Sequence, residues 1–220
     1  MEWSWFPVQL SIFVASIATI IALLLGATAA YVIVQKEFRG KSIIETVFFL
    51  PLVLPPTVIG FLLIMIFGLH SPVGEWIVQL TGHTVLFTPT AAIIASAVVA
   101  FPLMYQSVKT GYQSVDQDIL DAGRTDGASE WWLWMFLLIP LSSRAIVTGI
   151  VLSFTRAFGE FGATLMFAGN IPGSTQTIPT AIYLAFESGE TMMAWYYVAI
   201  SIGFSFLLLF AINWMREKQY

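Results

Sequence analysis

The stretch SVDQDILDAGRTDGASEWWLWMFLLIP, residues 114–140, is the one long polar insertion in an otherwise apolar sequence. Apolar Val115, Ile119 and Ala122 recur at helical spacing in its first half, which predicts a short amphipathic helix. The chain then loosens at two glycines before a Trp-rich segment leads back into apolar sequence. A helix outside the membrane that docks onto a soluble partner fits this pattern, and an ordinary solvated loop fits its polarity equally well. The charged residues of the stretch are Asp116, Asp118, Asp121, Asp126, Glu130 and one base, Arg124.

The composition as a whole places the chain in a membrane. Of its 220 residues, 58% are hydrophobic and only 10% are charged. The mean hydropathy is +0.83, a value that excludes a soluble domain. The chain has no cysteine and only two histidines, so disulfides, thiolate chemistry and a histidine-based metal site are also excluded. We therefore expect an all-α integral membrane protein with one transmembrane domain over residues 1–220.

Five apolar runs are long enough to cross a bilayer, which takes roughly 20 helical residues. The predicted spans are residues 8–34, 43–69, 85–108, 133–158 and 192–214. We interpret the first as a retained span, because Glu2 is the only charge before it and the run is too long for a signal peptide. A further apolar run at residues 177–186 is too short to span comfortably. We predict an external or re-entrant helix there, with a sixth span as the alternative.

Basic residues set the expected orientation. They lie in the loop after the first span, around the polar loop after the third span, and at the C-terminus. The positive-inside rule then predicts an external N-terminus, a cytosolic C-terminus and a cytosolic 114–130 loop. The residues concerned are Lys36, Arg39, Lys41, Lys109, Arg124, Arg216 and Lys218.

The second span contains Pro51, Pro55 and Pro56. Three missing backbone donors predict a kinked or broken helix near the middle of the membrane. Irregular backbone at that depth is tolerated only where protein or a water-filled cavity covers it. A pathway-lining or gating element is therefore the functional interpretation, with a packing kink as the alternative. Pro102 and Pro140 predict further kinks in two other spans.

The fourth span carries two arginines. Arg144 should face the bundle interior, and we expect it to pair with Glu45 of the second span, because an unpaired charge in lipid is costly. Arg156 and Glu160 are four residues apart and can pair on one helical face. A pathway role for Arg156 and an outward-snorkelling side chain remain alternatives.

The polar loop resembles the EAA loop of ABC-importer permeases. That family pattern is Glu-Ala-Ala, three residues, Gly, then about nine residues to Ile-x-Leu-Pro. Here the matching residues are Asp121-Ala122-Gly123, Gly127 with the following Ala128, and Leu137-x-Ile139-Pro140. Asp for Glu, Gly for the second Ala and the exchanged Leu and Ile are departures from the pattern. The resemblance implies that Asp121, Ala122, Gly123, Gly127 and Ala128 belong to a cytosolic coupling helix held in a cleft of an ATPase subunit.

Two further segments extend the resemblance over nearly the whole chain. LPLVLPPTVIGFLL at residues 50–63 and RAFGEFGATLMFAGNIPGSTQTIP at residues 156–179 closely resemble the permease subunit of molybdate ABC importers, which has the type I importer fold. The resemblance makes tungstate or sulfate and thiosulfate the alternative substrates. The residues we expect along the pathway or gate are Pro55, Pro56, Arg156, Glu160, Gly162 and Asn170.

The resemblance also implies partners. It implies a homodimer, two cytosolic ATP-binding subunits and an external oxyanion-binding protein, with ATP and Mg²⁺ used by the partner and no cofactor in this chain. No Walker A or hydrolase motif occurs, so we expect a non-catalytic transport subunit in the cell membrane. The polar loop lacks the basic stripe of a nucleic-acid binder. Two alternatives remain. An ion-coupled secondary transporter would need coupling carboxylates in the spans. A membrane-embedded scaffold with no transport role would explain the apolar composition but not the broken second span.

Overall fold

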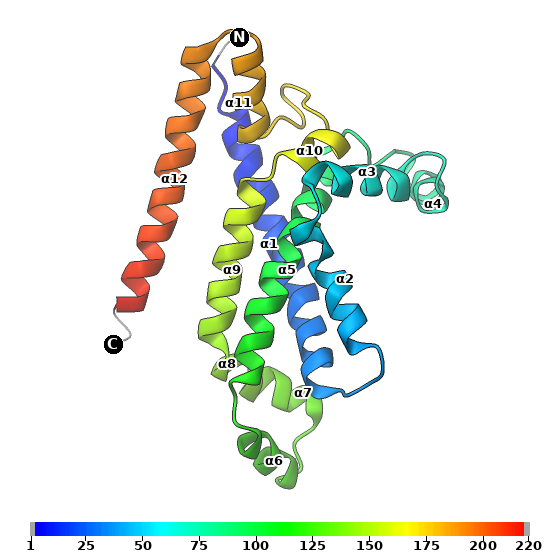
Figure 1. Ribbon diagram of the computed structural model, residues 1–220, viewed down its shortest axis with the longest axis vertical. Coiled ribbons are helices and arrows are strands. Elements are labelled where there is room, and N and C mark those ends of the chain that lie inside the picture. Colours follow the sequence, from blue (N-terminus) through cyan, green and yellow to red (C-terminus); the bar gives the residue numbers. More distant parts are fainter. Residues whose placement is uncertain (1–2, 218–220) are drawn as a thin grey trace.

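The computed structural model describes residues 3–217, with side chains to residue 210, and every regular element in this range is helical (Figure 1). The predicted all-α class is therefore confirmed. Three helices are long and apolar enough to cross a membrane, or five when each of two bent helix pairs counts as one span. Five is the number that the apolar runs predicted. Trp214 and the bases Arg216 and Lys218 lie outside the described side chains.

Three long helices form the centre of the molecule. They are α1 (Phe6–Gln35), α5 (Pro89–Gln113) and α9 (Ser143–Phe158), which lie side by side in Figure 1 and pack on one another. Small residues allow the close approach, as is usual where helices pack in lipid without a hydrophobic driving force. A Cβ added to Gly111 of α5 would lie 2.6 Å from the Cβ of Ala145 on α9. Buried alanines at Ala15, Ala18 and Ala22 line the corresponding face of α1.

The second predicted span is broken. Helix α2 (Lys41–Val53) and helix α3 (Pro56–Phe67) meet at an angle of 114°. Leu54 and Pro55 between them are extended, with ψ of 143° and 136°. In Figure 1, α3 runs across the molecule where α2 runs along it. Pro55 and Pro56 therefore coincide with the break that the sequence predicted. Pro51 does not interrupt the helix, because α2 continues through it.

The fourth predicted span, residues 133–158, is not one helix. Its first part consists of α7 (Glu130–Leu133), the π-helical turn η1 (Trp134–Leu138) and α8 (Ile139–Leu141), bent by 76° from α9. The break falls at Ser142, two residues after Pro140, so the predicted kink is present. Pro102 is different, because α5 continues through it without a break.

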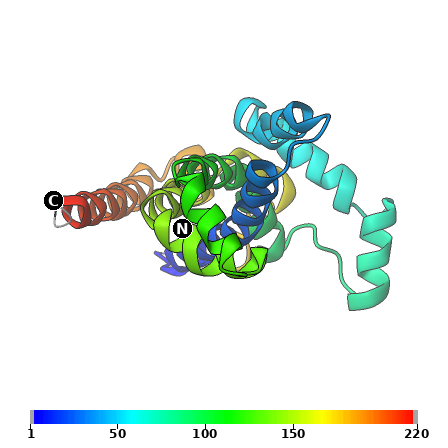
Figure 2. The same ribbon diagram turned by 90° about the horizontal axis from the view of Figure 1, so that it is seen from below.

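The remaining helices lie around this centre. Residues 177–186 do form a helix, α11 (Ile178–Glu187), after the short α10 (Gly162–Phe167). The last helix, α12 (Thr191–Glu217), packs on α11 near its start, contacts α9 through Phe204, and is otherwise directed away from the bundle (Figures 1 and 2). Helix α4 (Pro72–Thr81) was not predicted from the sequence. Ser71 caps its N-terminus, and the Ser71 side chain accepts a hydrogen bond from the Gly74 amide.

Candidate functional site

The 114–130 loop contains helix α6 (Gln117–Thr125), which hangs at one end of the molecule (Figure 1). Its N-terminus is capped by Asp116, whose carboxylate accepts from the Asp118 amide at 3.0 Å. Leu120 is buried and anchors the helix, whereas Ile119 stays 43% exposed and Ala122 is exposed. The predicted apolar face of Val115, Ile119 and Ala122 is therefore divided, with Val115 buried and the other two exposed. Ile119 and Ala122 are therefore accessible to a partner on this side of α6.

Two glycines shape the end of α6. The Ala128 amide donates to the Gly123 carbonyl at 3.0 Å and the Gly127 amide donates to the Arg124 carbonyl at 3.0 Å. These bonds form a Schellman motif, in which Gly127 adopts φ of +86°. Gly123 lies so close to the segment that follows that an added Cβ would be 2.5 Å from the Leu133 Cδ2. Gly127, the glycine of the family pattern, and Gly123, which departs from it, therefore both have local structural reasons.

A cavity of about 740 Å³ opens beside these glycines. Four of the five predicted coupling residues line it, and Ile119 and Trp132 add apolar surface. These four are Ala122, Gly123, Gly127 and Ala128. Asp121 is not among the lining residues, and its carboxylate instead accepts from the Arg124 Nη1 at 2.6 Å.

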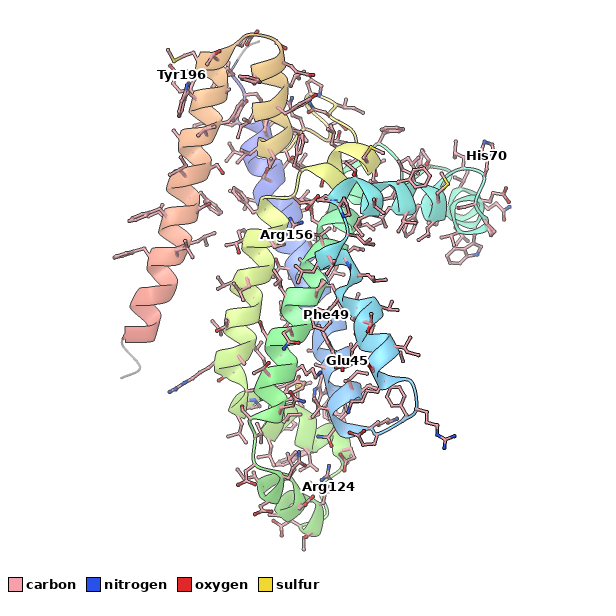
Figure 3. All side chains as sticks on the ribbon, in the orientation of Figure 1. Glu45, Phe49, His70, Arg124, Arg156 and Tyr196 are labelled. Atoms are coloured by element: carbon pink, nitrogen blue, oxygen red, sulfur yellow. The ribbon has the colours of Figure 1, made fainter. Side chains whose placement is uncertain are left out.

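Arg124, which sequence analysis did not assign to the site, connects this loop to other helices. Its Nε and Nη2 donate to the two carboxylate oxygens of Glu130 at 2.8 and 3.2 Å, and Nη2 also donates to Gln35 Oε1 at 3.3 Å. The bonds to Glu130 and Asp121 raise the pKa of Arg124 further above its usual range. The guanidinium therefore remains charged at every physiological pH. Figure 3 shows Arg124 on α6, at the end of the molecule.

The structure brings the broken second span against the segment after α9. An added Cβ on Gly162 would lie 2.8 Å from the Pro56 Cβ, and one on Gly60 would lie 2.5 Å from the Met166 Cβ. Helices α3 and α10 are therefore in close contact just beyond the Pro55 bend. Of the predicted pathway residues, Pro56 and Gly162 are therefore brought together at this contact.

Arg156 and Glu160 form the predicted pair. Arg156 Nη1 lies 2.7 Å from Glu160 Oε2, and the Ala163 amide donates to Glu160 Oε1 at 2.8 Å. The Glu160 side chain is 1% exposed, so both of its oxygens serve to hold the turn between α9 and α10. Asn170 lies elsewhere, and its Nδ2 donates to the Thr180 carbonyl of α11 at 3.2 Å. Figure 3 shows Arg156 on α9 near the α2–α3 bend.

The expected pair between Arg144 and Glu45 is absent. Arg144 is exposed and forms no salt bridge with any residue in the described part of the chain. Glu45 Oε1 instead accepts from Tyr105 Oη at 2.6 Å and from Lys109 Nζ. The prediction failed because the third span was ended at residue 108, whereas α5 continues to Gln113 and presents Tyr105 and Lys109 one turn apart. That spacing, opposite a lone intramembrane acid, was the available signal.

Comparison with known proteins shows what this arrangement belongs to. The model of the family described as "Binding-protein-dependent transport system inner membrane component" matches residues 7–218. The protein YvgM of Bacillus subtilis (strain 168), named for a proposed role as a molybdenum transport system permease protein, is 54% identical over 94% of this chain and 91% of its own. Molybdenum transport system permease protein ModB of Escherichia coli (strain K12) is 38% identical over 97% and 93%. Sulfate transport system permease protein CysT of the same strain is 30% identical over 95% and 74%.

Solved structures share the fold. A chain of the MetNI methionine ABC transporter in an inward-facing conformation superposes with a TM-score of 0.69 at 14% identity, covering 96% of this chain and 94% of its own. A chain of a bacterial ABC transporter that imports alginate gives a TM-score of 0.75 at 12% identity, covering 97% and 78%. These structures show that the chain has the fold of ABC-importer permeases, and the family match over nearly the whole chain establishes that the protein belongs to the inner-membrane components of binding-protein-dependent transport systems.

Proposed function

We propose that this chain is the membrane subunit of an ATP-driven molybdate importer. Two copies form the translocation path, two ATP-hydrolysing subunits bind their cytosolic side, and an external binding protein delivers the oxyanion. The chain itself performs no catalysis and carries no cofactor. The N-terminus lies outside and the 114–130 loop lies in the cytosol, as the distribution of basic residues favours.

The observation that carries this proposal is the surface of α6. A capped helix ends at a Schellman glycine, shows Ile119 and Ala122 to solvent, and borders a cavity that Trp132 helps to line. This surface offers apolar contacts to a partner within a loop that is otherwise polar. An ATPase subunit that covers it can move α6 directly. We infer that ATP binding draws the two α6 helices of the dimer together and opens the path outward, and that hydrolysis resets it.

Molybdate is favoured by the two relatives named for molybdenum, which are more similar to this chain than the sulfate permease is. Tungstate and sulfate or thiosulfate are the alternatives. Purified chain, ATPase subunit and binding protein in one proteoliposome should take up molybdate only with ATP, and excess sulfate should compete weakly. Uptake of sulfate but not molybdate would contradict the proposal that molybdate is the substrate.

The contacts of Glu45 argue against an ion-coupled secondary transporter. A coupling carboxylate must exchange protons or ions, yet both the Tyr105 hydroxyl and the Lys109 ammonium already donate to one oxygen of Glu45. ATP-independent uptake driven by an ion gradient in the same proteoliposomes would favour that alternative.

Gly127→Asp should reduce uptake more than tenfold and leave membrane insertion unchanged. An added Cβ at Gly127 meets nothing within 4 Å in the chain itself, so the new carboxylate would face the partner beside the existing acidic residues. Placing like charges together, or burying an unpaired charge, at an interface weakens the binding free energy by several kcal/mol. Uptake and retention of the ATPase subunit on the purified complex are the measurements.

Gly127→Asn is the matched control. Asn has nearly the size of Asp and tolerates the left-handed backbone equally well, so it separates added charge from backbone strain. We expect the Asn variant to keep most of its uptake. Normal uptake by Gly127→Asp would show that this part of the loop does not face the ATPase.

A further inference from the structure

The connection between α6 and the membrane helices depends on few side chains. Leu120 is the buried residue of α6, and Gly123 rests against Leu133. Apolar contacts such as these hold α6 against the neighbouring segments but are not directional. A displacement of α6 therefore needs a second, directional contact before it can move the rest of the chain.

Arg124 supplies contacts of that kind. Its guanidinium reaches α6 through Asp121, the start of α7 through Glu130, and the end of α1 through Gln35. The two parallel hydrogen bonds to Glu130 fix the plane of the Arg124 guanidinium. The ammonium group of a lysine at this position could not form such a planar, two-bond contact. One side chain of α6 thus holds both the neighbouring α7 and the end of α1, which lies 89 residues away in the chain.

The chain of contacts continues into the membrane helices. Tyr31 of α1 donates to Glu130 Oε2 at 3.3 Å, and its ring lies 5.6 Å from the ring of Trp134. Trp134 Nε1 in turn donates to the hydroxyl of Tyr112 at 3.1 Å. Tyr112 is fully buried on α5. A continuous path therefore leads from α6 to α1 and α5, two of the three central helices.

We propose that Arg124 and Glu130 are positioning residues that transmit the displacement of α6 to α1 and α5 during transport. This inference rests on the proposed function of α6 as the helix that the ATPase moves. Because the side chains of Arg124 and Glu130 are 34% and 57% exposed, their pair contributes little to folding. Its loss can therefore change coupling while the chain remains folded.

The test compares variants in the complete reconstituted transporter, with molybdate as the substrate. Arg124→Gln should retain its ATPase subunits and hydrolyse ATP, while molybdate taken up per ATP hydrolysed falls about tenfold, within the range of coupling between sites. Arg124→Lys keeps the charge but loses the fork, and we expect it to be similarly poor. Arg39→Gln is the control, because Arg39 is an exposed base that forms no salt bridge within the described residues.

Arg124→Glu and Glu130→Arg should each lower the ratio of molybdate taken up to ATP hydrolysed. The double variant, in which the two charges are exchanged, should restore part of that loss. A wild-type ratio in Arg124→Gln, or loss of the ATPase subunits from it, would overturn the inference, since the second result would make Arg124 a docking residue. Full activity of Arg124→Lys would also overturn it, because charge alone would then suffice. Failure of the proposed function is distinguishable, because the wild-type complex would then show no ATP-driven uptake.

Discussion

Replacing Pro55 and Pro56 together with alanine is expected to reduce molybdate uptake more than tenfold while ATP hydrolysis continues. The double change adds backbone donors at the two positions where α2 gives way to α3. Each new helical hydrogen bond contributes about 1 kcal/mol net, so two bonds shift a bent–straight equilibrium by more than tenfold. Straightening the 114° bend would also separate Pro56 from Gly162.

Uptake and hydrolysis should be measured on the same reconstituted sample. Pro51→Ala is the matched control, because α2 already continues through Pro51 and the change alters no bend. If the bend only serves packing, the double variant will lose thermal stability and keep its uptake per folded complex. Unaltered uptake would therefore refute a gating role for this break.

Glu45→Ala should destabilise the chain by about 3 kcal/mol or more, which corresponds to a Tm lower by about 6–12 °C. None of the thirteen residues of α2 is buried, so α2 depends on Glu45 and on aromatic contacts such as Phe48 with Tyr105 for its attachment to α5. Removing the carboxylate leaves the Lys109 ammonium without a counter-charge in apolar surroundings. Thermal unfolding of the purified chain in detergent is the measurement.

A double-mutant cycle tests this account. Glu45→Ala combined with Lys109→Met should regain most of the lost stability, because no uncompensated charge remains. Glu37→Ala is the control, since Glu37 is 88% exposed in its pair with Lys41 and its loss should change stability by less than about 0.5 kcal/mol. Additive effects of the Glu45 and Lys109 changes would contradict the pairing.

The candidate site was only partly predictable from sequence. The Schellman turn at Gly127 and the pair of Arg156 with Glu160 follow from glycine's access to positive φ and from the spacing of four residues along one turn. Arg124 was not assigned, because its partners Gln35 and Tyr31 (through Glu130) lie about 90 residues away in the chain. Nothing in the local pattern of residues 114–130 indicates that α1 ends beside them.

The sequence by itself determined the features that depend on neighbouring residues. Composition indicated a helical membrane protein, and the prolines at Pro55 and Pro56 predicted the broken span, since a missing donor acts within one helical turn. The polar run predicted α6. Each of these is a short-range effect of the kind that a single sequence displays.

Only the tertiary structure decided which side chains meet. Val115, Ile119, Leu120 and Ala122 allow more than one buried face for α6, and packing in the core cluster that contains Tyr112 and Leu138 selected Leu120. The sequence allowed a basic partner for Glu45 from more than one helix, and the packing of α2 on α5 selected Lys109 over Arg144. Helix ends and long-range pairs are set by the free energy of the whole packed bundle, which no local pattern of residues specifies.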